Sequence, residues 1–150
     1  MAWAVLVVDD HGMVGELMAA AFEGWPAVKS VAYSTSAEDA LHRVRQHPPD
    51  IAFVDARMPG TSGVELIKNL KSKYTRTRLV GMTSFEEDET LAEMLQAGVH
   101  GLLLKRSTSR QEIRLCLEQV MAGRSYFSAQ VTQRITASPK LLQAPPHLSS

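Results

Sequence analysis

Short apolar runs alternate along this chain with segments in which apolar residues recur at helical spacing. The first such segment places Val14, Leu17, Met18 and Ala21 on one face of a helix. The central apolar runs show no polar alternation, as expected for strands that are covered on both faces. Strands that alternate with helices are typical of right-handed βαβ units, so we predict an α/β fold with a doubly wound, five-stranded parallel sheet and helices on both faces. The strands are expected at residues 5–8, 28–33, 51–54, 78–82 and 99–104.

Capping and turn residues set the expected ends of the helices. Ser36, followed three residues later by Asp39, is typical of a helix N-terminus, and the prolines at 48–49 end that helix. Two later helices are expected to end at glycines, which favour the position just beyond a helix C-terminus. These glycines are Gly98 and Gly123, the second of which ends a helix expected at 107–122, and one more short helix is expected at 128–136.

The chain length of 150 residues allows one domain with a real core and a short tail. We expect the domain at 1–123 and a short helical extension at 124–137. Residues 138–150 are rich in Pro, Ser, Leu and Gln, which is typical of a linker.

The charge balance excludes some classes of partner. Lys plus Arg and Asp plus Glu both number 16, so the net charge is zero and a broad positive surface for DNA or an acidic membrane is not expected. Cys116 is the single cysteine, so it cannot form an internal disulfide. No apolar run approaches the roughly 20 residues that span a bilayer, and the first eight residues lack a basic leader. A cytoplasmic protein without a membrane partner is expected.

Polar residues follow four of the predicted strands directly. Asp9 and Asp10 follow the first strand, Asp55 the third, Thr83 the fourth and Lys105 the fifth. Side chains at the carboxyl ends of neighbouring parallel strands converge on one crevice. Mg²⁺ binds carboxylates together with phosphate oxygens, and a carboxylate can act as a nucleophile toward phosphorus. The set therefore predicts a site for Mg²⁺ and a phosphoryl group.

Each of these residues alone has a simpler interpretation. Asp9 and Asp10 could be a solvated pair that starts a turn, and Asp55 an ordinary residue at a strand end. Thr83 and Lys105 are equally unremarkable when taken singly. The occurrence of all five at four strand ends favours the functional interpretation.

Four segments of the chain resemble the motifs of response-regulator receiver domains. They are VVDDH at 7–11, VDARMPG at 54–60, MTS at 82–84 and GVHGLLLK at 98–105. The resemblance covers about residues 3–123 and implies a flavodoxin-like, receiver-type fold. The opening DDH and the segment VMAGRSYFS at 120–128 look most like the NarL/FixJ (LuxR-type) subfamily of transcriptional regulators.

The resemblance implies a role for each site residue. Asp55 would accept phosphate from a histidine kinase, and Thr83 and Lys105 would hold the phosphoryl oxygens. Asp9, Asp10, Asp55 and the backbone carbonyl of Arg57 would bind Mg²⁺. The chain would then be a phosphorylation-dependent switch rather than a turnover enzyme.

The subfamily also suggests a homodimer that forms on phosphorylation through the first and fifth helices. Leu115 lies opposite the apolar stripe of the fifth helix and is the candidate interface residue. The alternative is a singly exposed leucine, which is common on protein surfaces.

Several positions depart from the family pattern. Leu102 stands three residues before Lys105, where Tyr or Phe is usual, and Arg57 and Gly12 replace the more usual Asn and Pro. Leucine has no hydroxyl, so we expect a weaker switch between Thr83 and Leu102, carried mainly by residues 84–88 and the fourth helix. The DNA-binding domain of the subfamily is absent from these 150 residues, so we expect DNA to be reached only through an output domain outside them. A truncated receiver is the first explanation, and a stand-alone receiver the second.

Two other functions compete with the switch. Leu102 and Arg57 leave open a phosphorylation-independent binding module with the same fold. A haloacid-dehalogenase-like phosphatase would also use Asp, Thr, Lys and Mg²⁺, but it expects Asp-x-Asp at the first strand, where this chain has Asp9-Asp10-His11. It usually carries a cap insertion as well, for which this chain has no room.

Overall fold

A computed structural model describes residues 2–10, 12–58, 62–84, 88–106 and 108–137, except for the side chains of residues 13 and 88. The predicted linker at 138–150 lies outside the described residues, as do residues 59–61 and 85–87 of the two loops. None of the described helices has the length and apolar content needed to cross a membrane.

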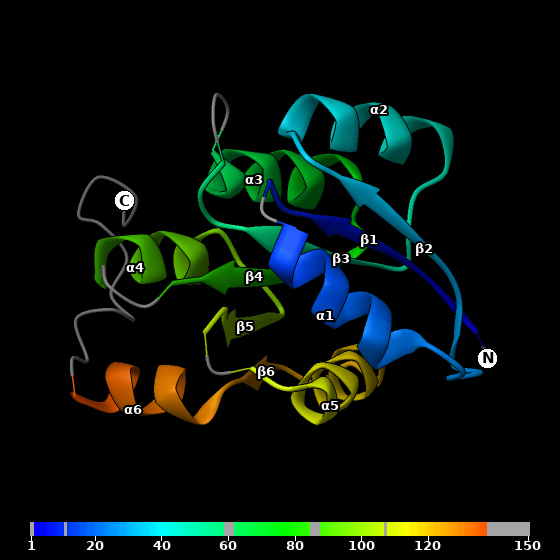
Figure 1. The fold of residues 1–150 in the computed structure, drawn as a ribbon. Coiled ribbons are helices and arrows are strands. Elements are labelled where there is room, and N and C mark those ends of the chain that lie inside the picture. The colour runs from blue at the N-terminus through cyan, green and yellow to red at the C-terminus, as the bar shows by residue number, and fades with distance from the viewer. Residues whose placement is uncertain (1, 11, 59–61, 85–87, 107, 138–150) are drawn as a thin grey trace.

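Strands and helices alternate along the chain as predicted (Figure 1). The strands are β1 (Trp3–Val8), β2 (Val28–Ser34), β3 (Ile51–Asp55), β4 (Arg78–Thr83), β5 (Gly101–Leu104) and β6 (Tyr126–Phe127). The helices are α1 (Gly12–Phe22), α2 (Ala37–Gln46), α3 (Gly63–Lys73), α4 (Asp88–Gln96), α5 (Arg110–Met121) and α6 (Ala129–Ala137).

The strands form one parallel sheet in the order β2-β1-β3-β4-β5-β6. The prediction of five strands was wrong, because β6 adds a sixth strand at the edge beside β5. Its two residues are too few to show any period in the sequence. The close approach depends on Gly101, where a Cβ would lie 2.8 Å from the carbonyl oxygen of Tyr126.

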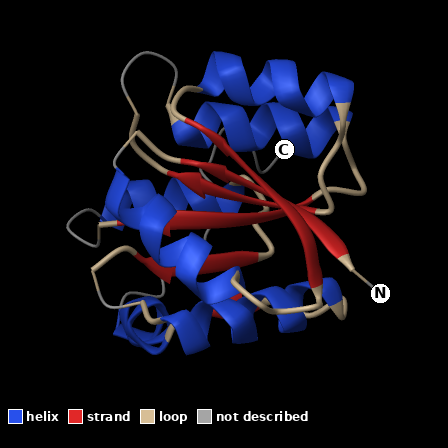
Figure 2. Ribbon diagram, turned by 45° about the vertical axis from the view of Figure 1, so that its right-hand side comes forward, coloured by secondary structure: helices blue, strands red, loops and turns tan. Residues whose placement is uncertain are grey.

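Helices cover both faces of the sheet (Figure 2), and the core forms two layers, one on each face. Buried side chains of α1 and α5 pack on one face, and those of α2, α3, α4 and α6 pack on the other. Successive residues of β1 enter opposite layers: Val5 and Val7 join the first, and Leu6 and Val8 the second. Because helices cover both faces of the sheet, the central strands carry apolar residues without polar alternation. The predicted helices on both faces are confirmed.

Most predicted helix ends are confirmed. The Ser36 hydroxyl accepts a hydrogen bond from the backbone N–H of Asp39, and Gly98 and Gly123 have positive φ angles of +84° and +88°. The fifth helix begins later than the predicted residue 107, because the hydroxyl of Ser109 caps it by accepting from the N–H of Glu112. Because β1, β3, β4 and β5 pair in parallel, their carboxyl ends lie together at one end of the sheet.

Candidate functional site

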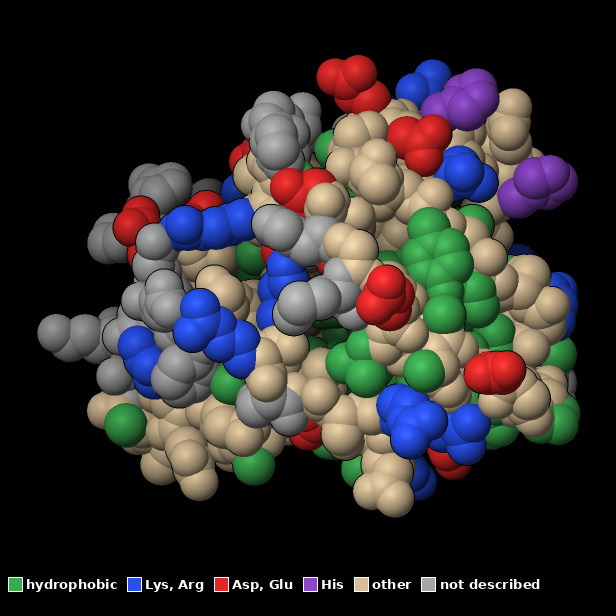
Figure 3. Space-filling model, viewed as in Figure 1, with side chains coloured by type: hydrophobic (Ala, Val, Ile, Leu, Met, Phe, Trp, Pro, Cys, Tyr) green, Lys and Arg blue, Asp and Glu red, His purple; other side chains and the backbone are tan. Residues whose placement is uncertain are grey.

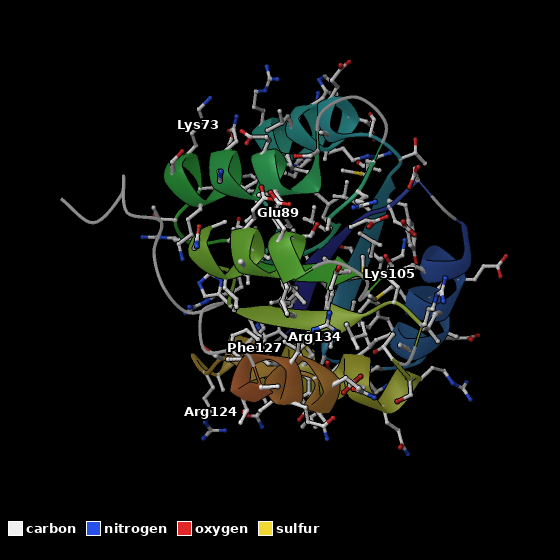
Figure 4. The ribbon with its side chains drawn as sticks, turned by 90° about the vertical axis from the view of Figure 1, so that its left-hand side faces the viewer. Lys73, Glu89, Lys105, Arg124, Phe127 and Arg134 are labelled. Carbon is white, nitrogen blue, oxygen red and sulfur yellow. The ribbon has the colours of Figure 1, made fainter. Side chains whose placement is uncertain are left out.

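The predicted polar residues gather at the carboxyl ends of four parallel strands. Asp9 directly follows β1, Asp55 ends β3, Thr83 ends β4 and Lys105 directly follows β5. Asp9, Asp55 and Thr83 are buried, and Lys105 lies at the rim of the sheet (Figure 4). The topology thus brings together residues that are up to 96 positions apart in the chain.

Lys105 joins the two buried carboxylates. Its Nζ lies 2.8 Å from Oδ2 of Asp55 and 3.3 Å from Oδ1 of Asp9. The side chains of Asp9 and Asp55 are only 2% and 4% exposed, so the ammonium offsets charge that water cannot reach. Through its backbone, Lys105 also donates from N–H to the carbonyl oxygen of Thr83, at 2.9 Å.

The site shifts the pKa of both partners in this ion pair. Burial raises the pKa of Asp55 above its ordinary value, and the Asp9 carboxyl raises it further, although Lys105 and the N–H of Arg57 act in the opposite direction. Burial acts to lower the pKa of Lys105, but Asp55 and Asp9 together outweigh it, and the pKa is raised. Both shifts reflect charges that are held close together in a poorly solvated place.

The loop after β3 fixes the carboxylate of Asp55. Oδ1 of Asp55 accepts a hydrogen bond from the N–H of Arg57 at 3.1 Å, while Oδ2 faces Lys105. The N–H of Gly63, at the start of α3, donates to the carbonyl oxygen of Ala56 at 3.1 Å. A Cβ at Gly63 would overlap the carbonyl oxygen of Asp55. Gly63 is therefore a residue of the site that sequence reasoning placed only in a turn.

Three carboxylates could hold a metal ion in this structure. Oxygen atoms of Asp9, Asp10 and Asp55 lie within 4.8 Å of one another. Carboxylate oxygens are the ligands that hard cations such as Mg²⁺ prefer, so the donor set fits the predicted ion. The backbone carbonyl of Arg57, two residues beyond Asp55, stays a predicted fourth ligand.

A comparison of the sequence with known families decides its class. The model of the family described as the response regulator receiver domain matches residues 5–118. This chain belongs to the response regulator receiver family. The response regulator GacA of Pseudomonas aeruginosa is 31% identical over 131 residues, which are 87% of this receiver and 61% of GacA. The receiver thus spans less than two thirds of the length of this relative.

Solved structures agree with this class and with the predicted subfamily. A LuxR-family response regulator from Aurantimonas sp. SI85-9A1 is similar to this receiver with a TM-score of 0.83 and 26% identity, over 93% of this chain and 99% of that one. The signal receiver domain of NarL from Mycobacterium tuberculosis is similar with a TM-score of 0.74 and 32% identity, over 82% of this chain and 98% of that one.

Two further predicted residues of the receiver lie away from the carboxylates. Leu102 is fully buried in the core layer that contains α3, α4 and α6. Leu115 is 45% exposed on the outer side of α5, while its neighbours Cys116 and Leu117 are fully buried. The predicted orientation of α5 is confirmed, but the role of Leu115 in an interface stays a prediction.

Sequence reasoning gave His100 no role, yet it joins two strands of the receiver. The ring nitrogen Nδ1 of His100 accepts a hydrogen bond from the backbone N–H of Leu79 at 2.9 Å, and the backbone N–H of His100 donates to the carbonyl oxygen of Leu79 at 2.7 Å. Burial lowers the pKa of His100, and the charges of Lys71 and Arg78 lower it further. No spacing or period in the sequence signals this role, because it depends on the pairing of β4 with β5.

Charges of both signs are interspersed over the face of the receiver in Figure 3, among the residues described there. This arrangement accords with the zero net charge of the chain. The described part of that face offers no broad positive surface for the phosphates of DNA.

Proposed function

We propose that this receiver is a phosphorylation-dependent switch in which Asp55 accepts a phosphoryl group from a histidine kinase. The observation that carries the proposal is the contact of the Asp55 carboxylate with the Lys105 ammonium, at 2.8 Å, beside the carboxylates of Asp9 and Asp10. An oxygen of Asp55 would attack the phosphorus atom, and the bond from phosphorus to the donor's imidazole nitrogen would break. The electron pair of that bond leaves with the imidazole, and Asp55 becomes an acyl phosphate.

The neighbouring residues have distinct tasks in this reaction. The N–H of Arg57 orients the Asp55 carboxylate through the bond at 3.1 Å. Lys105 already lies against the reacting carboxylate, so it needs only a small shift to reach a phosphoryl oxygen. The hydroxyl of Thr83 can donate to another phosphoryl oxygen.

Asp9, Asp10, Asp55 and the backbone carbonyl of Arg57 are the proposed ligands of Mg²⁺. The ion would offset the negative charge that the carboxylates and the phosphoryl group bring together. The spacing of the three carboxylates supports the proposal, since their oxygens lie within 4.8 Å of one another.

The proposal predicts a single phosphoacceptor. Asp55→Asn should abolish the mass increase that acetyl phosphate and Mg²⁺ produce in the intact protein, because the amide is no nucleophile. Asp39→Asn is the matched control, since Asp39 is a half-exposed aspartate on α2 that pairs with Arg43. Equal phosphorylation of wild type and Asp55→Asn would refute the assignment.

A phosphorylation-independent binding module is the second candidate function. It is favoured by the ion pairs of Lys105, which already satisfy two carboxylates without a phosphoryl group, and by the replacement of the usual aromatic residue by Leu102. The same mass measurement separates the two functions, because a pure binding module gives no adduct with any phosphodonor. A phosphatase would instead release phosphate continuously.

The remaining parts of the proposal concern partners and output. We propose that phosphorylation promotes a homodimer in which Leu115 on α5 takes part, which is supported by its exposure. Residues 1–123 are the proposed receiver proper, 124–137 the extension, and 138–150 a linker to a DNA-binding output domain. The comparison with GacA supports a further domain, because this chain spans 61% of that relative. A cytoplasmic location accords with a kinase partner and stays a prediction.

A further inference from the structure

Leu102 lies where β4, β5 and β6 meet. It is paired with Gly81 of β4 on one side and with Phe127 of β6 on the other. A Cβ at Gly81 would lie 2.9 Å from Cδ2 of Leu102 and 2.9 Å from Sδ of Met94 on α4. These two side chains fill the space over Gly81, so β4 cannot shift there without moving at least one of them.

The backbone of Leu102 is bonded to the start of α6. Its carbonyl oxygen accepts a hydrogen bond from the N–H of Ser128 at 3.0 Å. Ser128 is fully buried and begins the helix: its hydroxyl accepts from the N–H of Val131 at 3.3 Å, and its carbonyl oxygen from the N–H of Thr132 at 2.9 Å. Ser128 therefore joins β5 to the first turn of α6.

α6 also packs on the same face of the sheet as α4. Val131 is fully buried in the core layer that holds Leu102 and Met94, and Phe127 and Ile135 pack against that layer. Figure 4 shows α4, β5 and α6 in a row, with Phe127 and Arg134 at the α6 end. α6 is thus an integral part of the core and is not an appendage on the surface.

We propose that α6 reports the phosphorylation state of Asp55, with Leu102 as the link from β4 through β6. This inference rests on the proposed function. Thr83 and Lys105 would both bind the phosphoryl group. Thr83 ends β4 and Lys105 directly follows β5, and the backbone N–H of Lys105 donates to the carbonyl oxygen of Thr83 at 2.9 Å. A pull on these ends changes the position of β4 relative to β5. Gly81, two residues before Thr83, is in tight contact with Leu102, three residues before Lys105, and this contact passes the change on. The link needs a filled space and a backbone bond, and it needs no aromatic hydroxyl.

The proposal extends the expectation that residues 84–88 and α4 carry most of the switch. Met94 of α4 shares the space over Gly81 with Leu102, so α4 and α6 respond together. Because α6 lies immediately before the proposed linker at 138–150, its response is the step that would reach an output domain.

The first test compares hydrogen exchange of the full chain before and after phosphorylation, with the occupancy of Asp55 measured by intact mass. A change in the exchange of residues 126–137, together with α4, supports the proposal. A phosphorylated sample whose changes stop at α4 overturns it. Failure to form any adduct at Asp55 is a different result, because it refutes the proposed function instead.

A second test works without phosphate. Gly81→Ala places a methyl group against Leu102 and Met94, so it should speed exchange in 126–137 more than in the rest of the sheet. Ile51→Val is the matched control, because it removes a methyl group from a fully buried residue in the opposite core layer. The proposal is overturned if the two variants give the same pattern of exchange.

A third test weakens the receiving end. Ser128→Ala removes the hydroxyl that caps α6 but keeps the N–H that donates to Leu102, and loss of such a cap should speed local exchange about fivefold. The change that phosphorylation produces in α6 should then shrink, while phosphorylation of Asp55 stays at the wild-type level. Thr132→Ala, at an exposed position of the same helix, is the control. A full response of α6 in Ser128→Ala would contradict the role given to the cap.

Discussion

The two halves of the candidate site are built in different ways. The acid half consists of Asp9, Asp10 and Asp55, and it is carried by β1 and β3, which contain no glycine. All five residues of β3 are buried, as are the last four of β1, and their own side chains fill both faces of the sheet. The acid half is therefore held by close packing that leaves little room for movement.

The switch half consists of Thr83 and Lys105, and each of its strands contains a glycine. Over Gly81 in β4 the space is taken by Leu102 and Met94, and over Gly101 in β5 by the carbonyl oxygen of Tyr126. At these places neighbouring elements supply the packing, so a shift of the strand is passed to them. One sheet can therefore keep the carboxylates at fixed positions at the ends of β1 and β3 and transmit a movement through β4 and β5.

The largest expected effect is in the acid half. Gly63→Ala should lower the free energy of unfolding by more than about 3 kcal/mol, because the new methyl group would overlap the backbone at Asp55. Urea unfolding followed by circular dichroism measures the change. Gly12→Ala is the control, since a Cβ there meets nothing within 4 Å. Equal stability of the two variants would show that the acid half is less tightly packed than described.

Lys105→Ala tests the contact between the two halves. Without metal, we expect a loss of about 3 kcal/mol in the free energy of unfolding, because two buried carboxylates lose their counter-charge. Mg²⁺ should then stabilise the variant more than the wild type, which thermal unfolding with and without the ion will show. Lys68→Ala removes an exposed ion pair with Glu65 and should change little. A similar loss in both lysine variants would contradict the special role of Lys105.

His100 tests the pairing of β4 with β5 in the switch half. Its pKa is lowered in the folded protein, so below about pH 6.5 the unfolded chain binds the proton more readily. The stability that this neutral histidine contributes is complete above that pH and is lost as the pH falls toward the lowered folded value. His100→Gln should cost about 1 kcal/mol at pH 8 and flatten the decline between pH 7 and pH 5. Urea midpoints across this range give the answer, and an unchanged slope would rule out His100 as its source.

The smallest effect on stability is expected outside both halves. Leu115→Glu should change the free energy of unfolding by less than about 0.5 kcal/mol, since the side chain is already 45% exposed. It should nevertheless weaken the dimer of the phosphorylated protein, as measured by sedimentation. Gln111→Glu adds the same charge at another exposed position of α5. If both variants sediment like the wild type, the interface lies elsewhere.

Sequence patterns predicted those parts of the molecule that depend on local chemistry. Five strands followed from apolar runs, and the cap at Ser36 and the turn at Gly98 followed from residue type. The convergence of Asp9, Asp55 and Lys105 followed from the geometry of a parallel sheet.

The features that sequence reasoning missed depend on contacts between distant segments. β6 is defined by hydrogen bonds from the N–H groups of Tyr126 and Ser128 to the carbonyl oxygens of His100 and Leu102. A strand of two residues is too short to show a period in the sequence. In the sequence, Gly63 resembles any glycine of a turn. Only the structure shows that the backbone of Asp55 lies against it and leaves no room for a Cβ. The role of His100 likewise appears only when Leu79 becomes its neighbour in the sheet.

The short strand β6 covers the edge of β5, where another chain could otherwise pair. The N–H groups of Tyr126 and Ser128 occupy the carbonyl oxygens of His100 and Leu102, which would otherwise form an open sheet edge. Open edges recruit strands from other chains and lead to aggregation. A chain ended at Gly123 would expose this apolar edge, and we expect it to aggregate more at a given concentration than a chain that continues to Ala137. The two residues of β6 are thus expected to limit aggregation of the protein.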